Sequence, residues 1–356
     1  MKDCSAMDPR IWSKLPPDVM EHILLLLPLK TLLNLRPTCK AFTSLLFSPS
    51  FISKHSSSSP FSSFLLLSHP QYPHHFPLYD SQLCSWRNFS PSLHCSSSST
   101  LLSSSGGLFC LSDPSSSSFL VCNLFVKSSR KIEYPIPSLH LGHLTLVTTP
   151  VGYNIVLLCS ESASNSAFVY DSKVLSWRRF EGFSAVLSDN YHQRGTFFDG
   201  GLYFTTPEPF SVVRFDLESG KWERLVGELP NELTFVRLTS DGEGKLYLLG
   251  GVGDNGISRS IKLWEMGGEG DWVEMQRLPE MMCRKFVSVC YHNYEHVYCF
   301  WHDGMVCVCC YTWPEMLYYS VLRRTWRWLP KCPYLPLKCS CGFKWFSFVP
   351  KLYASV

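Results

Sequence analysis

The prediction of the fold rests on Asp199-Gly200-Gly201-Leu202-Tyr203-Phe204, followed by Val213-Arg214-Phe215-Asp216 and then by Ser219-Gly220-Lys221-Trp222-Glu223. This stretch contains a turn with glycine, an apolar run, a second run that ends in an aromatic residue and aspartate, another turn, and a tryptophan. Short apolar runs bounded by turn residues are typical of β-strands. Glycine suits the turns because it adopts backbone conformations that other residues resist. The stretch therefore predicts short strands joined by tight turns.

The same unit recurs along the chain from about Phe61 onward. Partial copies are Leu78-Tyr79-Asp80 with Ser85-Trp86-Arg87, Val169-Tyr170-Asp171 with Ser176-Trp177-Arg178, Leu246 to Gly251 with Asp271-Trp272-Val273, and Leu317-Tyr318-Tyr319 with Thr325-Trp326-Arg327. The marker tryptophans of successive copies lie 91, 45, 50 and 54 residues apart, so the first interval holds two units. The missing copy is expected near residue 131, where Ile132 or a neighbour replaces the tryptophan. The chain thus holds six units.

A repeat of roughly 40–50 residues with about four strands is the signature of a β-propeller blade. One blade cannot cover both faces of its sheet, so blades stack in a ring, which predicts an all-β, six-bladed propeller. The marker tryptophans are expected in its core rather than in a ligand site, because each buries roughly 150–250 Å². In such rings one blade mixes strands from both ends of the domain, so Phe343 to Val349 is expected to pair near Phe64 to Leu67.

The paired glycines, the Tyr-Asp step and the later tryptophan resemble kelch repeats in a divergent form. The resemblance covers the chain from about Phe61 to its C-terminal end. It implies a kelch-like propeller.

From Trp12 to Leu46 the sequence predicts three short helices. Asp18 precedes Glu21 by three residues, which indicates a capping box at the start of the first helix. Apolar residues then recur at helical spacing until Pro28 breaks the pattern. The second helix is expected to end before Pro37, which suits the first turn of the third.

This helical segment has more apolar residues than its own core can hold. Ile23 to Leu27 are apolar without interruption, and at ~100° per residue they cover the whole circumference of a helix. Segments shorter than ~40 residues seldom fold stably without a partner or a staple. The segment is therefore expected to bury itself against another protein or, as a helical cap, against the downstream domain. The serine tract at residues 55–60 favours the first alternative, because such tracts form flexible spacers.

Trp12 to Asp18, Ile23-Leu24, Leu27-Pro28, Leu32 and Arg36 to Phe42 closely resemble the F-box, a three-helix module that binds the Skp adaptor of cullin–RING ubiquitin ligases. The sequence departs from the family pattern at Thr38, where valine is usual, and at Phe42, where tryptophan is commoner. The resemblance implies an adaptor-binding set made of Leu15, Pro16, Ile23, Leu24, Leu27, Pro28, Leu32, Leu35, Cys39, Lys40 and Phe42, which contact the adaptor or support the helices that do. Met7 to Ser13 also looks like plant F-box proteins that act in floral and leaf development.

These features divide the 356 residues into two folded domains, in line with a loose prior of ~150 residues per domain. The fold class is α+β, with a three-helix F-box at residues 8–50, a serine-rich linker at 51–60 and a kelch-like propeller at 61–356. The serine tracts between residues 96 and 118 are interpreted as loops.

The composition limits the classes of function. A hydrophobic share of 45% is typical of a folding chain, and a net charge of +3 without a run of five basic residues argues against nucleic-acid binding. The polar N-terminus lacks the apolar core of a secretory signal, and Ile23 to Leu35 falls short of the ~20 residues that cross a bilayer. The protein is therefore expected inside the cell, in the nucleus, the cytoplasm or both, without a membrane partner and with its sixteen cysteines as thiols.

No catalytic residue, metal or other cofactor is expected. The sequence lacks a nucleophile elbow, a P-loop and a His-Glu-x-x-His motif. Nine cysteines lie between residues 283 and 341, and Cys307, Cys310, Cys339 and Cys341 would supply enough sulfur for a zinc ion. Met305 to Tyr311 also fits a buried strand, in which cysteine behaves as a small apolar residue, and this interpretation is favoured.

Together the resemblances imply a non-catalytic substrate-recognition subunit of an SCF-type ubiquitin ligase. Its F-box would dock on the Skp adaptor, and through it on the cullin–RING ligase, while the propeller holds an unknown protein substrate. Loops between blades, and between the second and third strands of a blade, are expected to form the substrate face. On this basis the substrate-face residues are His192, Arg194, Phe210, Arg259, Arg284 and His302. The alternative is a non-degradative scaffold or transcriptional co-regulator that uses the propeller as a protein-binding platform.

Overall fold

The computed structural model describes most of the propeller and part of the N-terminal helical module. The described residues are 14–27, 31–32, 35, 38, 40–46, 48, 50–51, 54, 63–72, 75–89, 99–124, 128–136, 143–160, 165–181, 192–225, 227–268, 270–335, 340–351, 354 and 356.

Within these residues the strands form six antiparallel sheets of four strands, blades 1 to 6. Blade 1 contains β24 (Lys344–Phe348), β1 (Phe64–Ser68), β2 (Phe76–Asp80) and β3 (Ser85–Phe89), and blade 2 contains β4 (Thr100–Ser105), β5 (Leu108–Asp113), β6 (Ser118–Asn123) and β7 (Ser128–Glu133). Blade 3 contains β8 (His143–Thr149), β9 (Gly152–Ser160), β10 (Asn165–Asp171) and β11 (Ser176–Glu181), and blade 4 contains β12 (Thr196–Phe198), β13 (Gly201–Thr205), β14 (Val212–Asp216) and β15 (Trp222–Arg224). Blade 5 contains β16 (Leu233–Ser240), β17 (Leu246–Asp254), β18 (Ile257–Met266) and β19 (Trp272–Arg277), and blade 6 contains β20 (Val297–His302), β21 (Met305–Cys310), β22 (Trp313–Ser320) and β23 (Thr325–Trp328).

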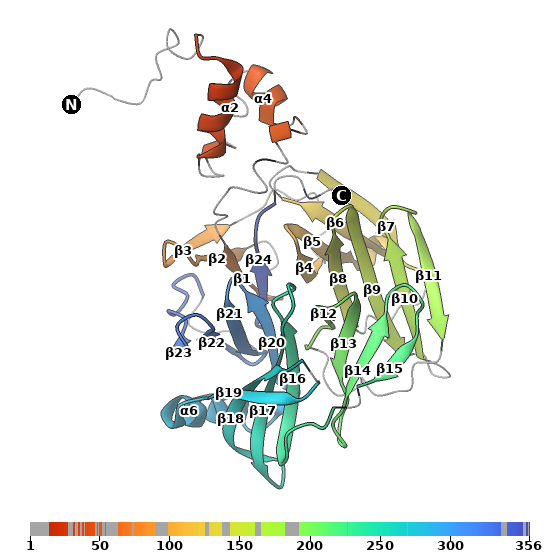
Figure 1. The fold of residues 1–356 in the computed structure, drawn as a ribbon, viewed down its shortest axis with the longest axis vertical. Helices are drawn as coiled ribbons and strands as arrows, with labels where there is room; N and C mark the ends of the chain where they lie inside the picture. Colours follow the sequence, from red (N-terminus) through yellow and green to blue (C-terminus); the bar gives the residue numbers. More distant parts are fainter. Residues whose placement is uncertain are drawn as a thin grey trace, which may run out of the picture.

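The first strands of the blades surround a common axis. β24 packs against β4 and β20, β4 packs against β8, and β16 packs against β12 and β20. The other strands of each blade follow outward from this inner ring (Figure 1). The architecture is the six-bladed propeller that the repeat predicts.

The C-terminal end of the chain completes blade 1. β24 pairs with β1 in an antiparallel register that runs from Phe64 opposite Phe348 to Ser68 opposite Lys344. The Phe348 ring also packs against Phe109 of blade 2, with ring centroids 4.6 Å apart. The predicted pairing between the two ends of the domain is confirmed. It closes the ring by joining the first and last segments of the propeller.

The marker tryptophans lie on the fourth strand of their blades. Each faces an aromatic or apolar residue of the third strand: Tyr79 faces Trp86, Tyr170 faces Trp177, Phe215 faces Trp222, Met266 faces Trp272 and Tyr319 faces Trp326. In blade 2, Phe119 faces Ile132, which takes the place of tryptophan as predicted. Trp326 is buried, and the other four tryptophans are half-buried against the cores of their blades.

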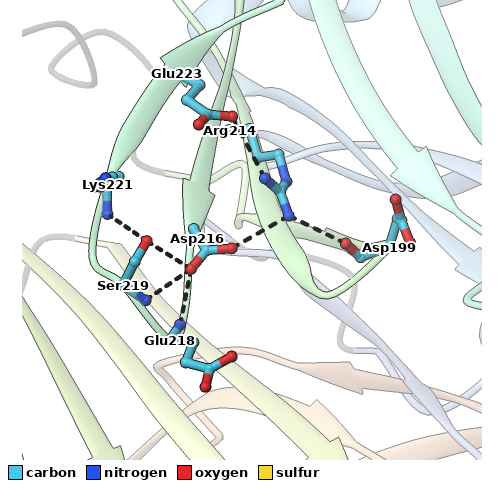
Figure 2. A network of polar contacts seen from close by, with 7 residues as sticks. All are labelled: Asp199, Arg214, Asp216, Glu218, Ser219, Lys221 and Glu223. Carbon is cyan, nitrogen blue, oxygen red and sulfur yellow. Dashed lines mark hydrogen bonds and ion pairs between the residues drawn. The ribbon is translucent and has the colours of Figure 1, made fainter.

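An aspartate at the end of the third strand fixes the turn into the fourth. In blade 4, Asp216 accepts hydrogen bonds from the backbone N–H groups of Ser219 and Glu218, at 2.7 and 3.2 Å, and from the Ser219 hydroxyl at 2.8 Å (Figure 2). The bond from the Ser219 N–H contributes most to lowering the pKa of Asp216. Asp80 and Asp171 accept equivalent bonds in blades 1 and 3. The Asp of the repeat is therefore a turn-forming residue.

Arg214 of β14 ties the same turn to its neighbours. Its guanidinium lies 3.3 Å from Asp216 and 3.5 Å from Glu223, and it donates to the carbonyl oxygen of Asp199 at 3.4 Å (Figure 2). The three contacts come from different strands or turns of blade 4, so they fix the edge of this blade.

Side chains link neighbouring blades around the axis. The inner edge of each first strand carries N–H and C=O groups that have no further strand to pair with. Ser104 Oγ donates to the Ser347 carbonyl at 2.7 Å, Ser103 Oγ accepts from the Leu146 N–H at 3.1 Å, Thr145 Oγ1 accepts from the Gly195 N–H at 3.0 Å, and Thr196 Oγ1 donates to the Leu238 carbonyl at 2.9 Å. Arg237 of blade 5 continues the series by donating to the Val297 carbonyl of blade 6. Each such bond stabilises the ring by roughly 0.5–1.5 kcal/mol.

The N-terminal module packs around its own small core. Its described helices are α2 (Pro17–Leu25) and α4 (Lys40–Leu46). The buried residues of the core are Leu24, Leu32, Leu46 and Phe51, and no described propeller residue belongs to it. Because Phe51 is 0% exposed in this core, the helical module extends beyond the predicted boundary at residue 50.

The start of α2 differs from the prediction. The helix begins at Pro17 with Pro16 at the N-cap position, and no side chain caps it, so the predicted capping box is wrong. Asp18 lies in the first turn, where a negative charge interacts favourably with the helix dipole. Glu21 instead pairs with Lys54 at 3.2 Å and ties the end of the module to α2.

Among the described residues of the propeller, one longer helix lies between the strands. α6 (Glu280–Cys290) connects blade 5 to blade 6 and buries Cys283, Phe286, Val287 and Cys290 against them. A short 3₁₀ turn, η2 (Tyr294–His296), leads from α6 into β20, and a second, η1 (Pro114–Ser116), joins β5 to β6. No helix among the described residues is both long and apolar enough to cross a membrane.

Replacing Phe348 with alanine tests the closure of the ring. Phe348 is 2% exposed and contacts the rings of Phe64 and Phe109 on two blades. The cavity left at this junction is expected to lower the free energy of unfolding by about 3–5 kcal/mol. Urea denaturation followed by tryptophan fluorescence measures the change. Leu322→Ala, at a side chain that is 92% exposed, is the control; equal stability of wild type and Phe348→Ala would contradict the account.

Candidate protein-binding surfaces

The N-terminal module exposes apolar residues of α2 and of the turn that follows it. Leu24 is fully buried, whereas Leu26 is 74% exposed and Val19 is 41% exposed. Ile23 and Leu27 are half-buried. The apolar run thus extends around the helix, and the described residues cover only part of it. This matches the surplus that the sequence predicts.

The predicted adaptor-binding residues divide into buried and accessible groups. Leu24 and Leu32 are buried and support the helices. Leu15, Ile23, Leu27, Leu35 and Phe42 are half-buried, and Pro16 and Lys40 are exposed. Pro28 and Cys39 lie outside the described residues. A partner could contact the accessible group without rearranging the module.

The propeller has two faces with different connections. Because neighbouring strands of a blade are antiparallel, the connections between blades and those between second and third strands meet on one face. This face carries α6 and is called the α6 face. The other turns lie on the opposite face, called the linker face, where the chain arrives from the helical module at Ser63. Figure 1 shows α6 and the N-terminal helices at opposite ends of the molecule.

Five of the six residues assigned to the substrate face belong to connections or strand ends of the α6 face. His192 and Arg194 precede β12, Phe210 lies between β13 and β14, Arg259 follows the turn between β17 and β18, and Arg284 lies on α6. These five residues therefore lie on the face that carries the connections between blades and between second and third strands, as expected from the sequence.

The assignment of His302 to the substrate face is wrong. His302 ends β20 and leads into β21, on the linker face. Its side chain is 0% exposed, and its ring nitrogens lie 2.9 Å from the hydroxyl oxygens of Ser81 and Ser347. Burial lowers the pKa of His302 to about 4, so its imidazole is neutral at pH 7. The residue joins blade 6 to blade 1.

A pocket of about 360 Å³ lies on the α6 face, between blade 4, blade 5 and η2. Arg194 and Phe210 line it. Gln193 fixes its floor, because Nε2 donates to the Leu238 carbonyl and Oε1 accepts from the Cys299 N–H, each at 3.0 Å. Arg194 also lines an axial cavity of about 610 Å³ that reaches the linker face, so it lies between the two cavities. A pocket of this size accepts a small ligand or a few side chains.

The other predicted residues of the α6 face do not line this pocket. The His192 ring stacks on Tyr311 with centroids 4.0 Å apart, and Nε2 lies 3.3 Å from Nδ1 of His296. Burial lowers the pKa of His192 to about 3 and keeps the ring neutral. Arg259 and Arg284 are exposed and form ion pairs with nearby acidic side chains.

Two further basic residues come near Arg194 only through the fold. Arg237 lines the same pocket and is 7% exposed. Lys344 lies at the start of β24, close enough for Arg194 to lower its pKa. Both residues occur in strands and belong to no local motif, so no sequence pattern predicts that they lie near Arg194.

Cys307 and Cys310 lie on opposite sides of blade 6. Cys307 packs in the core shared with blade 1, and Cys310 packs in the core shared with blade 5. These two cysteines therefore cannot hold one zinc ion together, and Cys339 lies outside the described residues. The part of the chain that the structure describes contains no cluster of three or more possible metal ligands. Burial raises the pKa of Cys307 well above its usual value.

Two family models match the chain at its two domains. The F-box domain model matches residues 12–54, and the KIB1-4 beta-propeller model matches residues 76–299. An F-box/kelch-repeat protein of Arabidopsis thaliana is 54% identical to this chain over 98% of its length and 90% of the relative's length. The chain belongs to the F-box/kelch-repeat family.

This F-box/kelch-repeat protein is also similar to plant proteins whose names refer to flowers and panicles. ABERRANT PANICLE ORGANIZATION 1 of Oryza sativa subsp. japonica is 25% identical and covers 97% of this chain and 90% of its own length. UNUSUAL FLORAL ORGANS of Arabidopsis thaliana is 24% identical and covers 92% and 80%. An N-terminal F-box followed by a propeller supports a substrate-adaptor role.

Among solved structures, a nidogen/laminin complex matches at 11% identity with a TM-score of 0.47, covering 81% of this chain and 99% of that one. TolB from Acinetobacter baumannii matches at 13% identity with a TM-score of 0.46, covering 88% and 73%.

The pH dependence of stability tests the buried position of His302. Its folded-state pKa of about 4 lies below the ordinary value of 6.5, so the unfolded chain binds a proton first as the pH falls. Stability is therefore lost between those two values. From pH 7 to pH 5, the free energy of unfolding should fall by about 2 kcal/mol more in wild type than in His302→Gln. Urea titrations at both pH values measure this difference, and parallel losses in the two proteins would rule out the buried, neutral histidine.

Proposed function

We propose that this F-box/kelch-repeat protein is the substrate-recognition subunit of an SCF-type cullin–RING ubiquitin ligase. The supporting observation is the apolar surface of its F-box, where Leu26 is 74% exposed and Ile23 and Leu27 are half-buried. Apolar surface removed from water contributes roughly 25 cal/mol per Å², so contact with a partner would stabilise the module. A Skp-type adaptor is the partner that the family membership favours.

The proposed mechanism is proximity. The F-box docks on the adaptor, the propeller holds the protein to be ubiquitinated, and the ligase thereby brings the conjugating enzyme close to the lysines of that protein. The gain comes from effective concentration, so the mechanism assigns no catalytic step to this chain. The proposal places the protein inside the cell, in the nucleus, the cytoplasm or both, and includes neither a membrane nor a nucleic-acid partner.

The two faces of the propeller suit the separation of adaptor docking from substrate binding. The chain arrives from the F-box on the linker face, so the adaptor and the cullin lie toward that side. The α6 face carries the pocket lined by Arg194 and Phe210. Its helix α6 lies at the opposite end of the molecule from the N-terminal helices (Figure 1). We therefore assign substrate binding to the α6 face.

Adaptor capture tests the proposal. The double variant Leu15→Ala/Pro16→Ala changes one half-buried and one exposed residue of the adaptor-binding set. Its affinity for a purified Skp adaptor should fall by roughly tenfold or more, because the proposed docking surface loses contacts of two of its residues. Titration of the full-length proteins by isothermal calorimetry measures the change.

His22→Ala is the matched control, because His22 is exposed on α2, the helix that Leu15 and Pro16 precede, and lies outside the family pattern. It should bind the adaptor like wild type. Absence of adaptor binding by the wild-type protein would exclude the ligase role and leave the scaffold role as the alternative.

A further inference from the structure

Two arginines with different surroundings line the pocket of the α6 face. Arg237 is 7% exposed, and its guanidinium donates to three backbone carbonyl oxygens in blade 5 and at the start of blade 6. Arg194 instead places its guanidinium over the Phe346 ring, with the guanidinium carbon 4.3 Å from the ring centroid. No described residue forms an ion pair or a hydrogen bond with this guanidinium. The Arg237 charge therefore has fixed partners, and the Arg194 charge faces the cavities.

A second cation lies on β24, the strand whose Phe346 packs against Arg194. Lys344 and Phe346 are two residues apart on β24, so their side chains leave the strand on the same side. Lys344 is half-buried and forms no ion pair within the described part of the chain. Burial, with a contribution from Arg194, lowers the pKa of Lys344 to about 8. Burial lowers the pKa of Arg194 to about 10. Both side chains thus remain charged at pH 7.

The acidic residues of the pocket do not neutralise these two charges. Glu208 and Glu295 line the pocket but are exposed, and neither pairs with Arg194 or Lys344. A positive charge that is withdrawn from water without a counter-charge is costly. A guanidinium binds carboxylate or phosphate oxygens through two parallel hydrogen bonds, so an oxyanion would remove this cost.

We propose that the pocket binds an acidic segment of the substrate protein, with a side-chain carboxylate or phosphoryl group held by Arg194 and with Lys344 adding positive charge nearby. The inference rests on the proposed function and names the chemistry that the α6 face selects. Phe210 and Phe235 provide apolar contacts for the residues that flank the acidic group. A volume of about 360 Å³ suits the insertion of a short peptide segment.

Replacement of each arginine distinguishes a binding role from a structural one. Arg194→Gln removes a charge that has neither a counter-charge nor a hydrogen-bond acceptor among the described residues, so the Tm of the unliganded protein should stay the same or rise. Arg237→Gln leaves buried carbonyl oxygens without their donor, so its Tm should fall. Differential scanning fluorimetry of the full-length proteins measures both shifts. A fall for Arg194→Gln as large as for Arg237→Gln would show that Arg194 is structural and would overturn the proposal.

Fluorescence anisotropy with a labelled hexaglutamate peptide tests the ligand chemistry. The wild-type protein should bind this peptide, and Arg194→Gln and Lys344→Gln should each bind it roughly tenfold or more weakly. Arg259→Gln, which removes an exposed arginine of the same face, should keep the wild-type affinity. A labelled phosphoserine peptide, tested in parallel, distinguishes phosphate from carboxylate as the preferred group. Binding of a neutral Gly-Ser peptide with the same affinity would contradict the proposal, as would the absence of binding by both acidic peptides.

The two proposals fail separately. Leu15→Ala/Pro16→Ala should bind the hexaglutamate peptide like wild type, and Arg194→Gln should still capture the adaptor. Loss of adaptor capture in wild type would therefore overturn the ligase role without affecting the pocket. Loss of peptide binding in wild type would overturn the acidic-segment proposal without affecting the ligase role.

Discussion

The apolar surface of the first helix is the constraint on which the functional account depends. A helix with apolar side chains at consecutive positions cannot direct all of them into one small core. In this module Leu24 enters the core with Leu32, Leu46 and Phe51, and Leu26 remains in water. No described residue of the propeller covers this surface. On the proposed function the module is one half of an interface, and a Skp-type adaptor supplies the other half.

The propeller, in contrast, satisfies its own edges. β24 brings the C-terminal end of the chain to β1, so blade 1 contains strands from both ends of the domain. Around the axis, hydroxyl side chains such as Ser103 and Thr196 bind backbone groups of the next blade. Buried His302 joins blades 6 and 1 on the linker face. Because these contacts link the blades on the inner strands and on the linker face, the α6 face is left for recognition, with the pocket lined by Arg194 and Phe210 near the axis.

The repeat made the propeller predictable because each blade places the same residue types at the same strand positions. Even blade 2, which lacks the tryptophan, keeps Phe119 opposite Ile132. Loop residues were harder to place, because the face on which a strand ends depends on whether it is the first, second, third or fourth strand of its blade. His302 ends a first strand and so lies on the linker face. The placement of Arg194 against Phe346, with Lys344 on the same strand, could not be predicted either, since residue 194 is far from β24 in sequence. They come together only because β24 closes the ring across the axis from blade 4.

Hydrogen–deuterium exchange of the full-length protein, with and without a purified Skp adaptor, tests the central claim most directly. The account predicts that the adaptor slows exchange in residues 14–27 and 40–46, which contain α2 and α4. It also predicts unchanged exchange on the α6 face, including α6 and the segment around Arg194. Protection confined to the propeller, or the absence of protection in the helical module, would contradict the claim that the F-box completes its apolar surface against the adaptor.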